Sequence, residues 1–267
     1  MKFRISICLV LLMIILSAID GYTHGTASVR GEQDITRLEL QIRSDKDSYL
    51  PGQVIELNFR ISNNTNESLL LEPGANVKTG RLQVFISEGT SEFLQYRGPR
   101  WGLLDGFPVK SKEMSPQTSE ETSATLLHNY VPATYHLDER SAKQRIKGLI
   151  NTEYAFPRPG VYYVKARLFD NAYANHIESK PIKILIEEAQ GSDLEIWNTI
   201  KNDGAYAFFL QTGHSTGQPT DPSTEEIAHV LETLIERYPS SKYIEGLRTS
   251  LAKRQSVEKS IRVDPEK

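Results

Sequence analysis

An aromatic-rich stretch between residues 95 and 108 is the most distinctive candidate for a binding function. It reads QYRGPRWGLLDGFP and places Tyr96, Trp101 and Phe107 among glycine and proline residues. Loops on a rigid scaffold commonly carry binding residues, and flat aromatic faces suit contact with a sugar or a peptide. In the simpler structural alternative, Trp101 folds over an open end of a β-structure and covers its core. Tyr96, Trp101 and Phe107 are therefore candidate ligand-binding residues.

A fourth candidate, Tyr173, lies in the connection DNAYANH, residues 170–176. The asparagines and the aspartate of this connection are typical turn formers, so Tyr173 is expected near the tip of a loop. There it would contact a partner, or it would serve as an ordinary half-exposed loop aromatic.

The usual signatures of catalysis and metal binding are missing from the sequence. It has no Gly-x-Ser-x-Gly elbow, no phosphate-binding glycine loop and no His-Glu-x-x-His motif. Its carboxylates fit the turns of a β-structure, and none has the spacing of a known calcium loop. We expect no cofactor, no metal site and no catalytic residue, and we favour a non-enzymatic role. The histidines and the carboxylates considered are His24, His128, His136, His176, His214, His229, Asp45, Asp47, Asp105, Asp138 and Asp170.

The composition is that of an ordinary globular protein. The chain has 267 residues, of which 39% are hydrophobic and 24% charged, and a formal net charge of -3. No basic or arginine-rich run is present, so a nucleic-acid partner is not expected.

The N-terminus predicts export from the cytoplasm. Lys2 and Arg4 precede the largely apolar residues 5–16, and small residues follow, with cleavage expected after Ala18 or Ala27. The apolar run is shorter than the roughly 20 residues that span a membrane as a helix. We expect a signal peptide over residues 1–27 and a periplasmic or secreted protein. The alternative is an anchor formed by an uncleaved N-terminal helix, which would be the chain's only membrane contact.

Cleavage of the export signal would also remove the only cysteine of the chain. The single cysteine, Cys8, lies within the apolar run, so the mature chain would contain none. Disulfides, thiol nucleophiles and thiolate metal sites are then excluded, and the fold must be stabilised by its core alone.

Alternating apolar and polar residues predict β-strands from about residue 35 to residue 188. Such alternation is typical of strands with one buried face, and turn signals recur every 10 to 12 residues. We expect a sandwich of about seven or eight antiparallel strands, with residues 97–123 irregular and residues 131–155 forming either a short helix or a long loop. The expected inward residues include Leu38, Leu40, Ile42, Ile55, Leu57, Phe59, Ile61, Leu82, Val84, Ile86, Ala166, Leu168, Ile182, Ile184 and Ile186.

Helical patterns replace the strand patterns after Gly191. Ser192 and Glu195 have the spacing of a capping box, and apolar residues repeat at intervals of three and four over 227–235. About three helices are expected over residues 192–256, with Pro239 ending one of them and residues 257–267 frayed.

The stretch DKDSYLPGQVIELNFRISN resembles the first strands of bacterial immunoglobulin-like domains and of macroglobulin-type domains. The stretch PGVYYVKA, which begins at Pro159 and contains Gly160, is similar to an immunoglobulin F strand. The resemblance implies an immunoglobulin-like sandwich in which Pro51 and Gly52 form a corner. Tyr162 would be a tyrosine corner whose hydroxyl bonds to nearby backbone, and Val164 would replace the disulfide cysteine between the sheets.

Residues 223–254 resemble one tetratricopeptide-type helix pair joined by a Tyr-Pro-Ser-Ser turn. One such pair cannot form a solenoid, since about three repeats are needed to bury a continuous core. It is therefore expected to pack on the sandwich or on a partner.

These patterns favour an exported, non-catalytic binding, adaptor or structural protein of the periplasm or cell surface. Its partner would be another protein or a component of the cell envelope. One alternative is an enzyme, or an accessory domain, that acts on cell-wall glycan or peptide through loop carboxylates and Trp101. Another is a protease inhibitor that presents a loop within residues 97–123.

Overall fold

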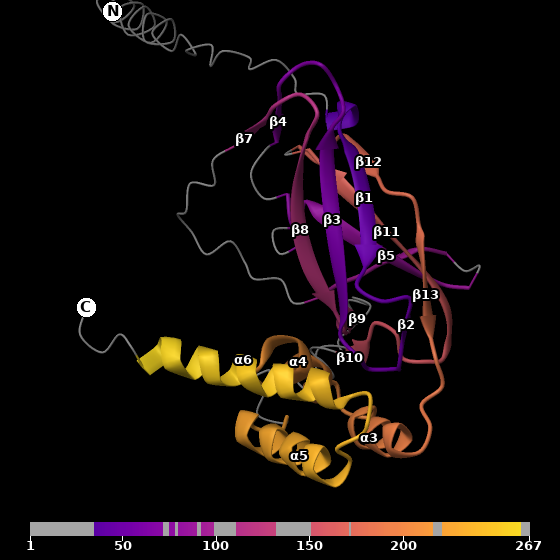
Figure 1. Ribbon diagram of the computed structural model, residues 1–267, viewed down its shortest axis with the longest axis vertical. Coiled ribbons are helices and arrows are strands. Elements are labelled where there is room, and N and C mark those ends of the chain that lie inside the picture. The colour runs from indigo at the N-terminus through magenta and orange to yellow at the C-terminus, as the bar shows by residue number, and fades with distance from the viewer. Residues whose placement is uncertain are drawn as a thin grey trace, which may run out of the picture. The chain divides into compact units, whose positions relative to one another are not determined.

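The protein is mainly β, with helices at its C-terminal end (Figure 1). The computed structural model describes residues 35–71, 75–77, 80–89, 92–98, 111–131, 151–170, 172–215 and 221–262. Within these residues, a 3-10 helix, η1 (Ile35–Arg37), precedes thirteen β-strands and four α-helices. The prediction of a β-region followed by helices is confirmed. The expected seven or eight strands and three helices were too few, because several strands are only two to four residues long and one expected helix is broken in two.

One large sheet contains three antiparallel strands in the order β1-β3-β8. Its members are β1 (Glu39–Ser44), β3 (Ile55–Asn63) and β8 (Thr118–Leu126). The register places Ile42 opposite Phe59 and Leu57 opposite Ala124. Apolar side chains at every second position thus lie on one face of the sheet, as the period of a strand requires.

The second large sheet has the order β2-β13-β11-β5-β6, and β12 also pairs with β11. The short strand β2 runs parallel to β13, and the other pairs are antiparallel. The strands are β2 (Ser48–Tyr49), β5 (Leu82–Glu88), β6 (Leu94–Gln95), β11 (Gly160–Phe169), β12 (His176–Glu178) and β13 (Ile182–Ile186). Two further antiparallel pairs lie beside these sheets: β4 (Leu69–Leu71) with β7 (Lys112–Met114), and β9 (His128–Val131) with β10 (Asn151–Tyr154).

The two large sheets share one core, which we call the sheet core. It contains inward residues of both sheets, among them Phe59 of β3 and Val164 of β11, each at most 1% exposed. All the inward residues expected from the alternation are buried in this core or, as with Ile86 and Ile182, packed against it. Each large apolar side chain buried there contributes about 1.5–3 kcal/mol relative to exposure.

Strand β8 corrects the expectation that residues 97–123 are irregular. Its sequence TSEETSATL has one large apolar residue, Leu126, and most of its other side chains are partly or fully exposed. It is the last strand of its sheet within the described residues. A strand with so little buried surface lacks the alternating pattern by which strands are recognised.

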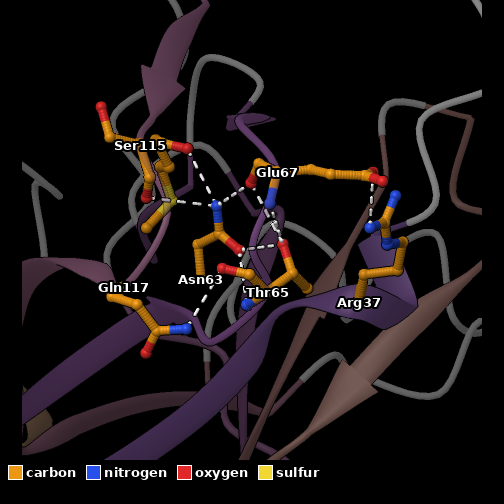
Figure 2. A network of polar contacts seen from close by, with 7 residues as sticks. Arg37, Asn63, Thr65, Glu67, Ser115 and Gln117 are labelled. Carbon is orange, nitrogen blue, oxygen red and sulfur yellow. Dashed lines mark hydrogen bonds and ion pairs between the residues drawn. The ribbon is translucent and has the colours of Figure 1, made fainter.

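A buried asparagine fixes the turn that follows β3 (Figure 2). The side-chain nitrogen of Asn63 donates to the carbonyls of Glu67 and Met114 at 2.8 and 2.9 Å, and to that of Ser115 at 3.2 Å. Its side-chain oxygen accepts from the backbone N–H and the hydroxyl of Thr65 at 3.0 and 2.7 Å. The fully hydrogen-bonded amide offsets the cost of burying a polar group and ties the turn after β3 to the end of β7.

Four helices follow the last strand: α3 (Ser192–Ile200), α4 (Gly204–Thr212), α5 (Thr224–Arg237) and α6 (Ile244–Arg262). The expected capping box at Ser192 and Glu195 is not formed, because α3 already begins after Gly191, which has no side chain to act as a cap. A complete capping box stands instead at Ser223 and Glu226, before α5. Helix α6 continues past residue 256, since neither glycine nor proline interrupts the sequence between Leu247 and Asp264.

The helices pack on the β-region through a second core, which we call the junction core. Leu50, Leu127 and Tyr154 of the β-region are buried there together with side chains of all four helices. The Tyr243 hydroxyl donates to the Pro51 carbonyl at 2.5 Å. The turn between α5 and α6 thus contacts the β-region, while α5 packs against α4 and α6.

Candidate functional site

One carboxylate accepts several hydrogen bonds at the connection between β11 and β12. Asp170 accepts hydrogen bonds from the backbone N–H groups of Ala174 and Asn175 at 2.9 and 3.0 Å, and from the Asn175 amide at 3.0 Å. Desolvation raises the pKa of Asp170, but these hydrogen bonds to its charged form outweigh that effect and lower the pKa below its usual value. Ala174 and Asn175 are thus tied to the end of β11.

Tyr173 projects from this loop into solvent. Its φ angle is 56°, in the left-handed region that non-glycine residues seldom adopt. Its side chain is 50% exposed. Such a backbone conformation persists only where the surroundings enforce it, and it is found frequently in binding sites.

Two further aromatic rings extend the surface of Tyr173. The centroid of Phe169 lies 5.6 Å from that of Tyr173 and 5.1 Å from that of His176, with interplanar angles of 34° and 36°. We call these residues, Phe169, Tyr173 and His176, the aromatic platform. Arg81 supports it from inside, because its guanidinium donates to the Phe169 carbonyl at 2.7 and 3.0 Å.

The platform suits non-covalent recognition. Its tilted rings present apolar faces, and the hydroxyl of Tyr173 and the imidazole of His176 supply hydrogen-bonding groups. Tyr173 was predicted as a binding residue, but Phe169 and His176 were not. Aromatic residues at both ends of the short turn FDNAYANH, residues 169–176, would have indicated them.

The other candidate ligand-binding residues do not join the platform. Tyr96 is 5% exposed, and its hydroxyl oxygen accepts a hydrogen bond from the amide of Gln211 in α4 at 3.1 Å. It thus links the end of β6 to the helices and presents no ring face to solvent. Trp101 and Phe107 lie outside the residues that the structure describes.

The residues expected to have structural roles lie in corners and in cores. Pro51 and Gly52 occupy the centre of a turn that Gln53 closes by donating to the Leu50 carbonyl at 3.1 Å, and Gly52 supplies the positive φ of 74°. Gly160, which begins β11, has a φ of 152°.

The strand β11 holds the other two structural residues. The Tyr162 hydroxyl donates to the Arg158 carbonyl at 3.1 Å, which is a bond to nearby backbone. Val164 is fully buried in the sheet core, between the two large sheets.

A groove of about 200 Å³ lies between the start of β3 with its preceding corner and helix α6. The corner contributes Gln53 and Glu56, and the helix contributes Gly246 and Lys253. The side-chain amide of Gln53 donates to the Lys242 carbonyl at 2.9 Å and so joins the two walls. No local sequence pattern predicts this groove, because 189 residues separate Gln53 from Lys242.

The described residues contain no group of three or more His, Cys, Asp or Glu side chains that could hold a metal ion. In the same part of the chain, no helix is both long and apolar enough to span a membrane.

Comparisons with known proteins give no family. No family model matches the chain, and no curated protein matches it. Solved structures give matches with low scores, including the sporulation control protein Spo0M from Bacillus subtilis, at 11% identity and a TM-score of 0.28, over 61% of this chain and 54% of that chain. A β-glucosidase from Listeria innocua matches at 10% identity over 56% of this chain and 16% of its own, with a TM-score of 0.28.

The DNA glycosylase AlkC of Pseudomonas fluorescens matches at 8% identity over 57% of this chain and 30% of its own, also with a TM-score of 0.28. The chain thus spans about half the length of Spo0M and less of the other two proteins. Scores at this level do not support an argument about shared fold or function.

Proposed function

We propose that the protein is an exported, non-catalytic binding or adaptor protein of the periplasm or cell surface. The aromatic platform is the observation that carries the proposal. Phe169 ends β11, His176 begins β12, and Tyr173 is half exposed in the loop between them, where Asp170 accepts hydrogen bonds from the backbone. A preorganised aromatic surface binds without first paying the entropy of ordering a loop. The charged and apolar pattern of residues 2–16 supports export.

We further propose that residues 35–188 form an immunoglobulin-like sandwich. In such domains the first, second and fifth main strands lie in one sheet and the third, sixth and seventh in the other. The order β1-β3-β8 facing β13-β11-β5 fits that scheme, and the Tyr162–Arg158 bond fits a tyrosine corner. The α5–α6 pair, joined by a turn at Pro239, fits a single tetratricopeptide-like unit.

The proposed ligand of the platform is a sugar or peptide component of the cell envelope, or an exported protein that exposes such a surface. Aromatic faces in a row contact the flat C–H faces of sugars and the apolar side chains of peptides. The proposed interaction involves no covalent step.

Binding to the cell envelope is the direct test. The purified protein is mixed with isolated cell-wall sacculi, and a tagged form is used to recover partners from a periplasmic extract. We expect Tyr173→Ala to lose specific retention. Tyr163→Ala is the matched control, because Tyr163 is 36% exposed on β11 and does not belong to the platform.

Two outcomes would contradict the proposal. Equal retention of Tyr173→Ala and the natural protein would remove the platform from the interaction. Absence of any specific retention, together with turnover of wall fragments, would favour the enzymatic alternative.

A further inference from the structure

The groove between β3 and α6 has an apolar floor. Leu210 of α4 and Leu247 of α6 line it and are at most 2% exposed, and the ring of Tyr243 lines it beside them. The Tyr243 hydroxyl is bonded to the Pro51 carbonyl, so that the ring is fixed in place. This floor is suited to an apolar side chain.

Gly246 leaves the helix wall of the groove open. A Cβ placed on Gly246 would meet no atom within 4 Å. Thr249 and Ser250 of the same helix also line the groove and are small. A ligand can therefore approach the helix closely, while a large side chain at position 246 would fill the space.

Side chains of opposite charge line the groove. Lys253 of α6 and Glu56 of β3 both contribute to its walls. Lys253 is partly buried, and its ammonium donates to the Gln211 carbonyl at 3.3 Å. Burial lowers the pKa of Lys253, and the negative charge of Glu56 acts in the opposite direction.

We propose that this groove binds a small zwitterion with an apolar side chain, namely an apolar α-amino acid, free or at the ends of a very short peptide. Lys253 would receive the carboxylate, Glu56 the ammonium group, and the floor the side chain. The volume of about 200 Å³ is smaller than the roughly 300–1,000 Å³ of pockets for drug-sized ligands, which limits the ligand to one or two residues. The site is separate from the aromatic platform and extends the proposed function to a small molecule.

Titration calorimetry with defined ligands tests the assignment. Free leucine is compared with N-acetyl-leucine, which lacks the ammonium group, and with leucinamide, which lacks the carboxylate. We expect leucine to bind saturably and each derivative to bind at least about tenfold more weakly, which corresponds to about 1.4 kcal/mol. The dipeptide leucyl-leucine distinguishes a free amino acid from a short peptide as the better ligand.

Variants separate the parts of the site. Lys253→Met and Glu56→Gln are expected to weaken leucine binding at least about tenfold. Gly246→Trp is expected to abolish it, and Thr249→Trp provides a second block if the first variant does not fold. The exposed Lys180→Met is the control, and thermal melts verify that every variant is folded.

The outcomes distinguish this site from the platform. Tyr173→Ala is expected to leave leucine binding unchanged, so loss of envelope binding alone concerns only the proposed function. Absence of saturable binding by leucine and leucyl-leucine would overturn the inference. Equal binding of leucine and both derivatives would also overturn it, because the charged pair would then recognise nothing.

Discussion

The sheet core and the junction core are built from different kinds of contact. The sheet core is mainly aliphatic, and its residues alternate along strands that belong to two large sheets. Both cores contain tyrosines, but their hydroxyls find different partners. In the sheet core, the hydroxyls of Tyr49 and Tyr162 bond to residues four positions earlier in the chain. In the junction core, those of Tyr154 and Tyr243 bond to residues 46 and 192 positions away. A buried hydroxyl requires a specific partner, and in the junction core that partner comes from a distant part of the chain.

The polar partners in the junction core lie across the boundary between strands and helices. The Tyr154 hydroxyl donates to the Ile200 carbonyl at 3.0 Å, and the ring of Tyr154 packs edge-on against Trp197 at 5.0 Å. The Gln211 side chain accepts from the backbone N–H of His128 at 2.8 Å and donates to the Thr125 carbonyl at 2.7 Å. These bonds join strands to helices, so we expect a single substitution in the junction core to cost more than a comparable one in the sheet core.

The largest effect is expected for Gly52→Ala in the junction core. A Cβ on Gly52 would overlap Cζ3 of Trp197 and lie 2.9 Å from Cε3, and the φ of 74° is unfavourable for alanine. Overpacking and the left-handed backbone together should lower the free energy of unfolding by about 4 kcal/mol. Chemical denaturation of the variant measures this loss.

Gly89→Ala is the matched control for this substitution. Gly89 has a φ of 59°, but a Cβ there would meet no atom within 4 Å. It should lose only the backbone contribution of about 1–2 kcal/mol. Equal losses for the two variants would show that Trp197 moves aside without cost.

The second effect is a loss of stability in acid. His128 is fully buried, and its ring packs edge-on against Phe208 at 5.4 Å. Burial lowers the pKa of His128 to about 4. Because the folded pKa lies below the unfolded value, the neutral ring favours folding above about pH 6.5, and this advantage disappears as the pH falls toward 4.

The size of the acid effect follows from the pKa difference. It should reach about 3 kcal/mol near pH 4. Denaturation at pH 7 and pH 4.5 measures it, with His128→Phe expected to reduce the difference between the two values. A difference that is the same in the variant would assign the acid effect to other groups.

The sequence predicted the sheet core better than the junction core for a physical reason. Burial on one face of a strand imposes a period of two, so residues 55–61 and 162–168 showed their inward faces directly. The junction core joins residues such as Gly52 and Trp197, which are distant in the sequence and follow no period. The break between α3 and α4 lies at the sequence KNDG, residues 201–204, whose turn-forming residues were not used as a stop signal. There Asp203 caps α4 by accepting from the Ala205 N–H at 2.8 Å.

The candidate sites were predicted only in part. Turn-forming residues around Tyr173 placed it in a loop, and the structure has it there, while its role in binding stays a prediction. The stacking of Phe169 and His176 depends on how the turn folds, which no local pattern encodes. The burial of Tyr96 was not predicted, because its partner, Gln211, comes from a helix 115 residues later.

The third prediction uses the same chemical change in both cores, beginning with Tyr243→Phe. The variant leaves the Pro51 carbonyl without the hydroxyl that now donates to it, in a buried position. We expect the free energy of unfolding to fall by about 2 kcal/mol, since an unsatisfied buried acceptor carries its full desolvation cost. Urea denaturation measures the change, and leucine binding in the groove should weaken as the ring of Tyr243 loses its anchor.

The smallest effect is expected for Tyr162→Phe in the sheet core. The lost hydroxyl bonds to the Arg158 carbonyl at 3.1 Å, and that bond is only partly buried, so that water can replace the hydroxyl. The loss should be about 1 kcal/mol, with binding to the envelope and to leucine unchanged. A loss as large as that of Tyr243→Phe would contradict the difference between the two cores, because a hydroxyl with a nearby, partly buried partner would then matter as much as one with a distant, buried partner. An unchanged melt would instead argue against a stabilising role for the Tyr162–Arg158 corner.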